Sequence, residues 1–231
     1  MTFDMLKNGV NNRMIDLDIC YKKRFNKNDL VWKQRVWAVL CQKFFQDFIS
    51  SEDTVIDFGA GHCEFINNIK CKNKIAVDLN PNTKKFADKD VKVLIISPDK
   101  LPVGLKGKVD VVFISNFLEH LNSKEEVLRI LKTAYDYLST KGRVIILQPN
   151  ISLVKEKYWD FIDHKIALND SSVIEALEMV GFKKLLFIER FLPFRTQNKF
   201  PKNILLIKIF LKLPCFLRFI AGQSLFIFSK R

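Results

Sequence analysis

The chain has 231 residues, is 48% hydrophobic and carries a formal net charge of +13, so it can bury one full α/β core. No apolar run reaches the roughly 18 residues that a membrane-spanning helix needs, and an integral membrane protein is not expected. The five cysteines include no C-x-x-C pair, which argues against a disulfide framework or a zinc ribbon. Since no secretory signal follows Met1, we expect a cytoplasmic location.

The first predicted element is a long helix that begins near Asn28. Its apolar residues recur at helical spacing and are Val31, Val36, Leu40, Phe44, Phe45 and Phe48. We expect this helix to pack on a sheet and to help close a ligand cleft. The chain therefore divides into a helical extension over residues 1–50 and one larger domain over residues 51–231.

Short segments rich in Val, Ile and Phe then alternate with segments of helical period. Strands are expected at about 54–58, 74–79, 91–96, 109–115, 142–147, 185–191 and 224–228. Short apolar strands separated by helical segments are typical of a parallel sheet with crossover helices. We therefore expect an α/β fold.

Two helices are expected between the later strands. Ser123 and Glu126 have the spacing of a capping box, and the helix that follows carries an apolar face. That face consists of Val127, Ile130, Leu131, Ala134 and Leu138. A second helix is expected over about 171–179, ending near Gly181, because glycine is a common helix stop.

A glycine-bearing turn follows the first expected strand. Asp57-Phe-Gly59-Ala-Gly61 leads from that strand into a helix, so the backbone can approach a ligand and present N–H groups. Asp78 ends the second strand, where a carboxylate can accept hydrogen bonds from both hydroxyls of a ribose. A nicotinamide fingerprint would have glycine in place of Glu64, which disfavours that cofactor. The alternative is that no ligand binds here: the two glycines then only make a tight turn from strand to helix, and Asp78 only caps the segment that follows it.

The turn resembles the first motif of class I S-adenosylmethionine-dependent methyltransferases, an acid, any residue, then Gly-x-Gly. Cys63 stands where the usual third glycine would be. The resemblance implies a Rossmann-like, seven-stranded, mostly parallel sheet with an antiparallel last strand and helices on both faces. It also implies S-adenosyl-L-methionine as the cofactor.

The same resemblance implies the cofactor-binding residues. They are Asp57, Gly59, Ala60, Gly61, Asp78, Leu79, Asn80, Ser97 and Asn116. The glycine turn would hold the methionine part and Asp78 the ribose, with Leu79 and Asn80 beside the adenine. Ser97 stands about where the family often has an Asp that contacts the adenine amino group. Asn116, after the fourth strand, is either a cofactor contact or a residue that satisfies the backbone at the strand end.

The acceptor side of the site is less closely defined. Methyl transfer needs an aligned acceptor and, for a hydroxyl, a base. The candidates for catalysis are His120, Asp163 and His164. His120 is either a general base or an anchor for the helix after it. Asp163 and His164 are either a base with its orienting carboxylate or a hydrogen-bonded pair that stabilises a loop.

The residues after the fourth strand also resemble a metal-binding motif. Asn116-x-x-Glu119-His120 with the later His164 resembles metal-dependent O-methyltransferases whose motif is Glu-x-x-Glu-His. Asn116 replaces the first Glu and is a weaker neutral oxygen ligand, so we expect no metal.

A long insertion over about 194–222 separates the last two strands. It is apolar, and its basic residues are spaced along it with no acidic residue. This composition is typical of a helix at a membrane interface, and the segment 200–220 is the candidate for peripheral contact with the inner face of a membrane. The alternative is a helix that folds onto its own domain or pairs two subunits of a homodimer. Pro214 should end this helix at about Lys212.

The whole chain more loosely resembles uncharacterised bacterial methyltransferases associated with surface-glycan synthesis, through YKKRF at 21–25 and YWDFIDH at 158–164. We expect methyl transfer to an oxygen in preference to a nitrogen. The expected acceptor is a saccharide or another small molecule, which includes lipid-linked acceptors. A methyltransferase of RNA or protein and a catalytically silent cofactor-binding protein are the alternatives. A nucleic-acid substrate is disfavoured because Asn116 is not followed by Pro-Pro-Tyr.

Overall fold

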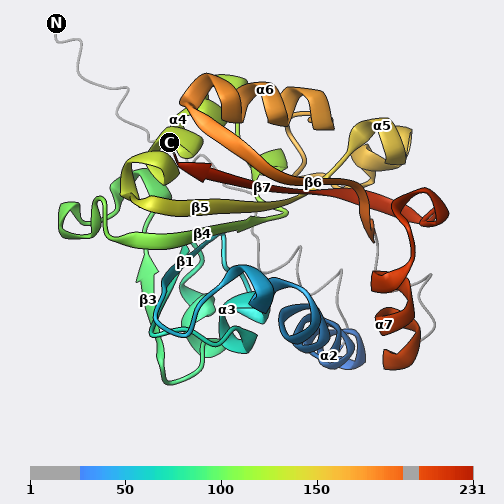
Figure 1. Ribbon diagram of the computed structural model, residues 1–231, viewed down its shortest axis with the longest axis horizontal. Coiled ribbons are helices and arrows are strands. Elements are labelled where there is room, and N and C mark those ends of the chain that lie inside the picture. The colour runs from blue at the N-terminus through green and yellow to red at the C-terminus, as the bar shows by residue number, and fades with distance from the viewer. Residues whose placement is uncertain (1–26, 195–202, 231) are drawn as a thin grey trace, which may run out of the picture.

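The computed structural model describes residues 27–194 and 203–230, which form one sheet with helices on both faces (Figure 1). Its strands are β1 (Thr54–Phe58), β2 (Asn73–Asp78), β3 (Val91–Ile95), β4 (Val109–Ser115), β5 (Leu138–Pro149), β6 (Phe182–Pro193) and β7 (Ala221–Lys230). Their order across the sheet is β3-β2-β1-β4-β5-β7-β6. The first five pair in parallel, and β7 runs antiparallel to both β5 and β6. The expected α/β, Rossmann-like fold class is confirmed.

The helices cover the sheet from two sides. They are α2 (Lys27–Lys43), α3 (Glu64–Asn68), α4 (Lys124–Tyr137), α5 (Ile151–Val154), α6 (Asp170–Val180) and α7 (Ile204–Lys212). In Figure 1, α2, α3 and α7 lie on one side of the sheet, and α4 and α6 on the other. Short 3-10 turns join them, among them η1 (Phe45–Phe48), η2 (Pro81–Lys85), η3 (Pro98–Lys100), η4 (Val103–Leu105), η5 (Leu118–His120), η6 (Lys155–Asp160) and η7 (Cys215–Leu217).

Each face of the sheet has its own hydrophobic core. Successive residues of a strand alternate between them: in β4, Phe113 joins the core under α2 and α3, whereas Val112 and Ile114 join the core under α4 and α6. Such alternation is the geometry of a pleated strand. Because both faces are covered, the central strands are apolar at nearly every position, which is why they could be located from the sequence.

Several predicted helix ends are confirmed by local geometry. Ser123 Oγ accepts a hydrogen bond from Glu126 N at 3.2 Å, although the Glu126 carboxylate accepts from Asn122 N, so only half of the predicted capping box forms. Gly181 ends α6 in the left-handed region at φ +108°. α7 ends at Lys212, two residues before Pro214, as the proline predicts.

Other boundaries differ from the expectation. Leu138, expected on the apolar face of a helix, is the first residue of β5 and pairs with Val109 of β4. The last three strands are longer at both ends than their apolar stretches suggested. The first helix ends at Lys43, and Phe45 lies in the 3-10 turn η1, where its ring contacts Phe113 at 5.3 Å between centroids. Tertiary pairing and packing set these ends, and hydrophobic periodicity does not record them.

Some expectations fall partly or wholly on residues outside those described. The motif at 21–25 and the first part of the expected extension lie there, as do residues 195–202 of the insertion. Within the described residues, no helix is long and apolar enough to cross a membrane.

Candidate active site

A cavity of about 400 Å³ opens at the carboxyl ends of the central strands. Asp57 and the glycine turn form one wall, Ser115 and Asn116 after β4 form another, and Pro149 ends the neighbouring β5. Helix α2 and the end of β6 close the cavity from the sides. Ligands of parallel α/β sheets bind at this edge, where the chain leaves the strands.

The glycine turn is fixed by backbone geometry that a side chain would disturb. Gly59 has φ +70°, and its N–H donates to Val77 O at 2.8 Å. A Cβ at Gly59 would lie 2.6 Å from Cδ2 of Phe117. Cys63, at the place of the usual third glycine, also takes a left-handed conformation, with φ 58°. The turn thus needs glycine at Gly59 for both conformation and space.

Asp78 lies against this turn, as the spacing predicted. Its Oδ2 accepts a hydrogen bond from Gly61 N at 2.7 Å, and its Oδ1 accepts from Asn80 N at 2.8 Å. Each carboxylate oxygen has two lone pairs, so both can accept a further hydrogen bond from a ligand hydroxyl.

The residues expected around the adenine lie beyond the cavity. Leu79 is 64% exposed, and Asn80 caps η2 by accepting from Asn82 N at 2.9 Å. Ser97 follows β3 and begins η3. Asp78, Leu79, Asn80 and Ser97 do not line the cavity, whereas Asp57, Gly59, Ala60, Gly61 and Asn116 do. The cavity therefore adjoins the methionine side of the expected cofactor site.

A partly buried ion pair supports the turn from α2. Lys33 Nζ lies 2.9 Å from Oε1 of Glu64, the first residue of α3. Burial alone would raise the pKa of Glu64, but the Lys33 ammonium and His62 outweigh it and lower that pKa to about 2. Burial, and then the nearby Glu64 and Asp78 carboxylates, raise the pKa of Asp57. Lys33 also lines the cavity, as does Trp37 one helical turn later. Their four-residue spacing on one helix is the sequence signal that could have identified them.

The three candidate catalytic residues come together on the other side of the cavity. Nδ1 of His120 lies 2.9 Å from the backbone oxygen of Asp163 and 3.6 Å from its Oδ2. The rings of His120 and His164 are 5.2 Å apart between centroids. Both histidines line the cavity, whereas Asp163 is buried behind His120. The contact between Asp163 and His120 was not anticipated from the sequence, which suggested His164 as its partner.

Glu119 lies at the centre of this group. Its Oε1 is 3.9 Å from Nε2 of His120 and 4.0 Å from Nε2 of His164. Its side chain is buried, and burial raises its pKa despite the nearby His120. Its Oε2 has no hydrogen-bond partner among the described residues. The backbone oxygen of Glu119 accepts from Lys165 N at 2.8 Å and from Ile166 N at 3.3 Å, which holds the two segments together.

Aromatic rings form the outer wall of the cavity. Phe161 stacks on His164 at 5.0 Å between centroids and meets Phe194 edge-on at 5.4 Å. Phe161 and Phe194 line the cavity, but Tyr158 is buried and donates its hydroxyl to Ile166 O at 2.9 Å. Trp159 is exposed on η6. The YWDFIDH motif therefore contributes Phe161 to the wall, which sequence reasoning missed.

Comparisons with known proteins agree with this geometry. The chain matches the methyltransferase domain family over residues 31–185. A methyltransferase structure from Archaeoglobus fulgidus has 22% identity, covers 93% of this chain and 100% of its own, and has a TM-score of 0.66. A methyltransferase from Thermotoga maritima has 16% identity, coverage of 91% and 98%, and a TM-score of 0.65.

The geranyl diphosphate C-methyltransferase of Streptomyces coelicolor is also similar, with 13% identity, coverage of 88% and 82%, and a TM-score of 0.60. No curated protein sequence matches the chain. The family match covers more than half of the chain, and the solved structures share its fold. The protein is an S-adenosylmethionine-dependent methyltransferase. It belongs to the methyltransferase domain family.

The turn geometry predicts the effect of adding one methyl group. Gly59→Ala should lower the affinity for S-adenosylhomocysteine about tenfold or more, because the alanine combines a strained φ with a clash against Phe117. Isothermal titration calorimetry measures this. Gly104→Ala is the matched control, because an added Cβ there meets nothing within 4 Å. Equal affinities of the two variants would contradict the role of Gly59.

The ion pair at Glu64 predicts a pH-dependent stability. Because the pKa of Glu64 is lower in the folded protein, its ionised carboxylate stabilises the fold at pH values above its ordinary pKa of 4.5. This contribution is lost as the pH falls toward about 2. Glu64→Gln should therefore lower the free energy of unfolding by about 2 kcal/mol at pH 7, and by progressively less under acid conditions. Urea titrations at several pH values measure this difference. Glu52→Gln, which removes an exposed pair with Lys72, should have little effect at any pH.

Proposed function

We propose that this methyltransferase transfers its methyl group to an oxygen of a small-molecule or saccharide acceptor, in the synthesis of a surface polysaccharide. One observation carries the choice of oxygen: a histidine whose Nδ1 lies 2.9 Å from a backbone oxygen stands in the cavity wall. Asp163 O can only accept a hydrogen bond, so Nδ1 of neutral His120 carries the proton. Nε2 is then unprotonated and can act as a base.

The residues of the chain have separate tasks in this proposal. When bound, S-adenosylmethionine supplies a sulfonium methyl group, and its transfer to a hydroxyl oxygen releases S-adenosylhomocysteine and one proton. His120 Nε2 would take that proton, and the buried Asp163 would hold the imidazole in position. His164 would orient the acceptor from the neighbouring wall. The walls of the cavity would restrict the acceptor to orientations suitable for transfer.

The cofactor would lie across the carboxyl edge of the sheet. We assign its methionine part to Asp57, Gly59, Ala60, Gly61 and Asn116, which line the cavity. The ribose is assigned to Asp78, and the adenine to Leu79, Asn80 and Ser97. The hydrogen bond that Gly61 donates to Asp78 supports this assignment, because it ties the two motifs together.

The acceptor is inferred from the cavity walls. Phe161 and Phe194 offer aromatic faces, which suit the apolar faces of a sugar ring. The geranyl diphosphate enzyme among the structural relatives acts on an isoprenoid diphosphate, which supports a small-molecule acceptor. We place the reaction in the cytoplasm. We divide the chain into a helical extension over residues 1–50 and a methyltransferase domain over residues 51–231. Peripheral membrane contact through 200–220 and a homodimer belong to the same proposal.

Labelled-methyl transfer tests the acceptor class directly. The protein is incubated with methyl-labelled S-adenosylmethionine and with separate glycan, lipid, RNA and protein fractions. Label in a glycan or glycolipid fraction is expected, as an alkali-stable methyl ether. Label confined to RNA or protein would refute the proposal. Calorimetric binding of S-adenosylhomocysteine without label in any fraction would instead favour a catalytically silent protein.

Replacing His120 separates a base from an anchor. His120→Ala should lower kcat by about 10²- to 10⁴-fold, the usual contribution of a general base. Added imidazole should restore part of the rate, because the cavity left by the ring can admit it. Affinity for S-adenosylhomocysteine and the melting temperature should stay near those of the unmodified protein. A lowered melting temperature without rescue would assign His120 to anchoring the turn.

A metal centre is the second candidate role for the same residues. One ligand atom each from Glu119, His120 and His164 lies within 4.8 Å of the other two. The buried and unpartnered Oε2 of Glu119 adds a further oxygen, so the donor set fits a divalent cation. A bound cation would polarise the acceptor hydroxyl, and these three residues would hold it.

A chelator distinguishes the two roles. If the cluster binds a metal, dialysis against EDTA should abolish transfer, and one divalent ion per chain should restore it. Glu119→Gln should then lower the stoichiometry of bound metal, measured by elemental analysis. Full activity after chelation, with the His120→Ala defect rescued by imidazole, would assign the cluster to proton transfer alone.

A further inference from the structure

The segment between β6 and β7 exposes a dense group of apolar side chains. Of the fifteen large hydrophobic residues that are exposed in the described part of the chain, seven lie within 205–220. They are Leu205, Leu206, Ile209, Phe216, Leu217, Phe219 and Ile220. Phe216 is 70% and Phe219 is 76% exposed. We call this group the 205–220 surface. Exposed apolar groups of this density mark interaction sites.

The 205–220 surface belongs to a segment that is anchored to the rest of the protein. Ile207 and Phe210 of α7 are buried in the core that α2 also lines, and α7 lies beside α2 in Figure 1. The buried Arg218 donates Nε to Leu213 O at 3.0 Å and Nη2 to Leu211 O at 2.9 Å. One side of the segment therefore packs on the domain, and the other faces outward.

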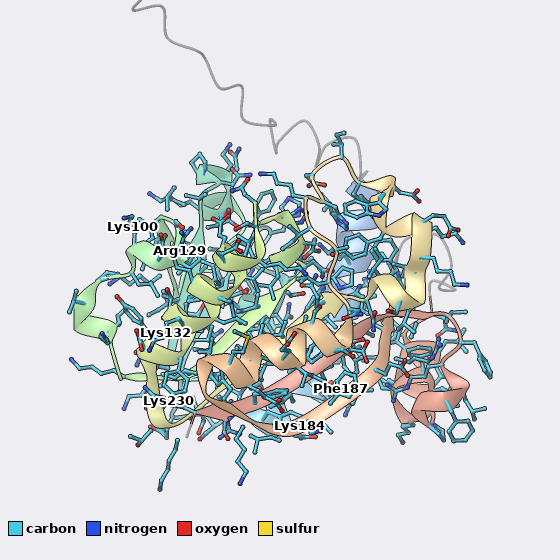
Figure 2. The ribbon with its side chains drawn as sticks, turned by 90° about the horizontal axis from the view of Figure 1, so that it is seen from above. Lys100, Arg129, Lys132, Lys184, Phe187 and Lys230 are labelled. Carbon is cyan, nitrogen blue, oxygen red and sulfur yellow. The ribbon has the colours of Figure 1, made fainter. Side chains whose placement is uncertain are left out.

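The charge of this segment is of one sign. Residues 194–222 include six basic residues and no acidic one. Lys208 and Lys212 are exposed on α7 beside the apolar side chains. The basic side chains of the α4 face, shown from above in Figure 2, are different: Arg129 pairs with Glu126 at 3.2 Å, and Lys132 pairs with Asp136. Residues 194–222 contain no acidic residue that could pair with Lys208 and Lys212 in this way, so the charge of the 205–220 surface suits an anionic partner.

The surface also adjoins the cavity. Leu192 lies near the end of β6, Phe194 directly follows that strand, and Gln223 lies near the start of β7; all three line the cavity. Helix α2 lines the cavity through Lys33 and Trp37 and packs against α7. Whatever covers the 205–220 surface therefore lies next to the methyl-transfer site.

We propose that the 205–220 surface docks on an anionic lipid bilayer, with Phe216 and Phe219 inserted and Lys208 and Lys212 at the headgroups. Exposed apolar side chains combined with basic ones are the composition of such interfacial segments. A second copy of the chain fits less well, because it would bring two segments of the same charge together. Docking places the cavity beside the bilayer, from which an amphiphilic acceptor can enter. This last step rests on the proposed function.

Sedimentation with lipid vesicles tests the surface without cofactor or acceptor. The full chain should bind vesicles of phosphatidylcholine with phosphatidylglycerol more tightly than phosphatidylcholine alone, and raised salt should release it. The variant Phe216→Ser with Phe219→Ser should bind about tenfold or more weakly, since two aromatic side chains lose their insertion. Lys208→Gln with Lys212→Gln should weaken binding by about tenfold or more and reduce the salt dependence.

Matched variants and calorimetry separate the possible causes. Val103→Ser with Met179→Ser removes two other exposed apolar residues, and Lys183→Gln with Lys184→Gln removes two other exposed lysines. Both controls should bind vesicles as the unmodified chain does. Every variant should still bind S-adenosylhomocysteine. If the unmodified chain does not bind S-adenosylhomocysteine, the cofactor site is refuted, but the vesicle-binding result still stands.

Three results would overturn the docking proposal. The unmodified chain could fail to bind anionic vesicles, or the control variants could weaken binding as much as the surface variants do. Light scattering could instead show that Phe216→Ser with Phe219→Ser turns a dimer into a monomer, which would make the surface a subunit interface.

Discussion

The hydrogen bond from Gly61 N to the Asp78 carboxylate joins the ends of two neighbouring strands at the site. It holds the glycine turn against β2, while Gly59 N donates to Val77 O on the same strand. If the turn moved away from β2, both hydrogen bonds would be lost, and each contributes about 0.5–1.5 kcal/mol to stability. Phe117 packs where a Cβ of Gly59 would be, so the loop after β4 depends on the same turn. Contacts within the chain thus hold the cavity wall that the glycine turn forms.

The opposite wall of the cavity, which carries His120 and His164, depends on a different kind of constraint. η5 and the segment 163–166 are far apart in the sequence, and the backbone oxygen of Glu119 joins them by accepting from Lys165 N and Ile166 N. This contact brings Asp163 to His120 and His164 to Glu119. The polar group is therefore assembled by tertiary structure, within a cavity closed by α2 and by the end of β6.

The sequence predicted the features that are encoded locally. The strand positions, the left-handed Gly181, the helix end before Pro214 and the contact between Asp78 and the glycine turn follow from apolar runs, backbone limits and motif spacing. The sequence did not predict the pairing of Asp163 with His120, because Asp163 and His164 are adjacent in the chain and no short-range pattern shows which side chain the carboxylate contacts. Phe161 and Phe194 were missed for the same reason: an aromatic residue that lines a cavity has the same local pattern as one that fills a core. Leu138 continued a helical pattern, but pairing with Val109 drew it into β5.

Arg218 restrains the segment that leads from α7 back to β7. Its guanidinium spans from the carbonyls near the end of α7 to Arg190 O on β6, at 3.4 Å. Because a planar, fully charged fork satisfies several carbonyls at once, the loop after α7 is braced at its midpoint. Little conformational entropy then remains to be lost when a partner covers the loop. Association would resemble rigid-body contact, with a heat-capacity change set by the apolar area that leaves water and little contribution from coupled folding.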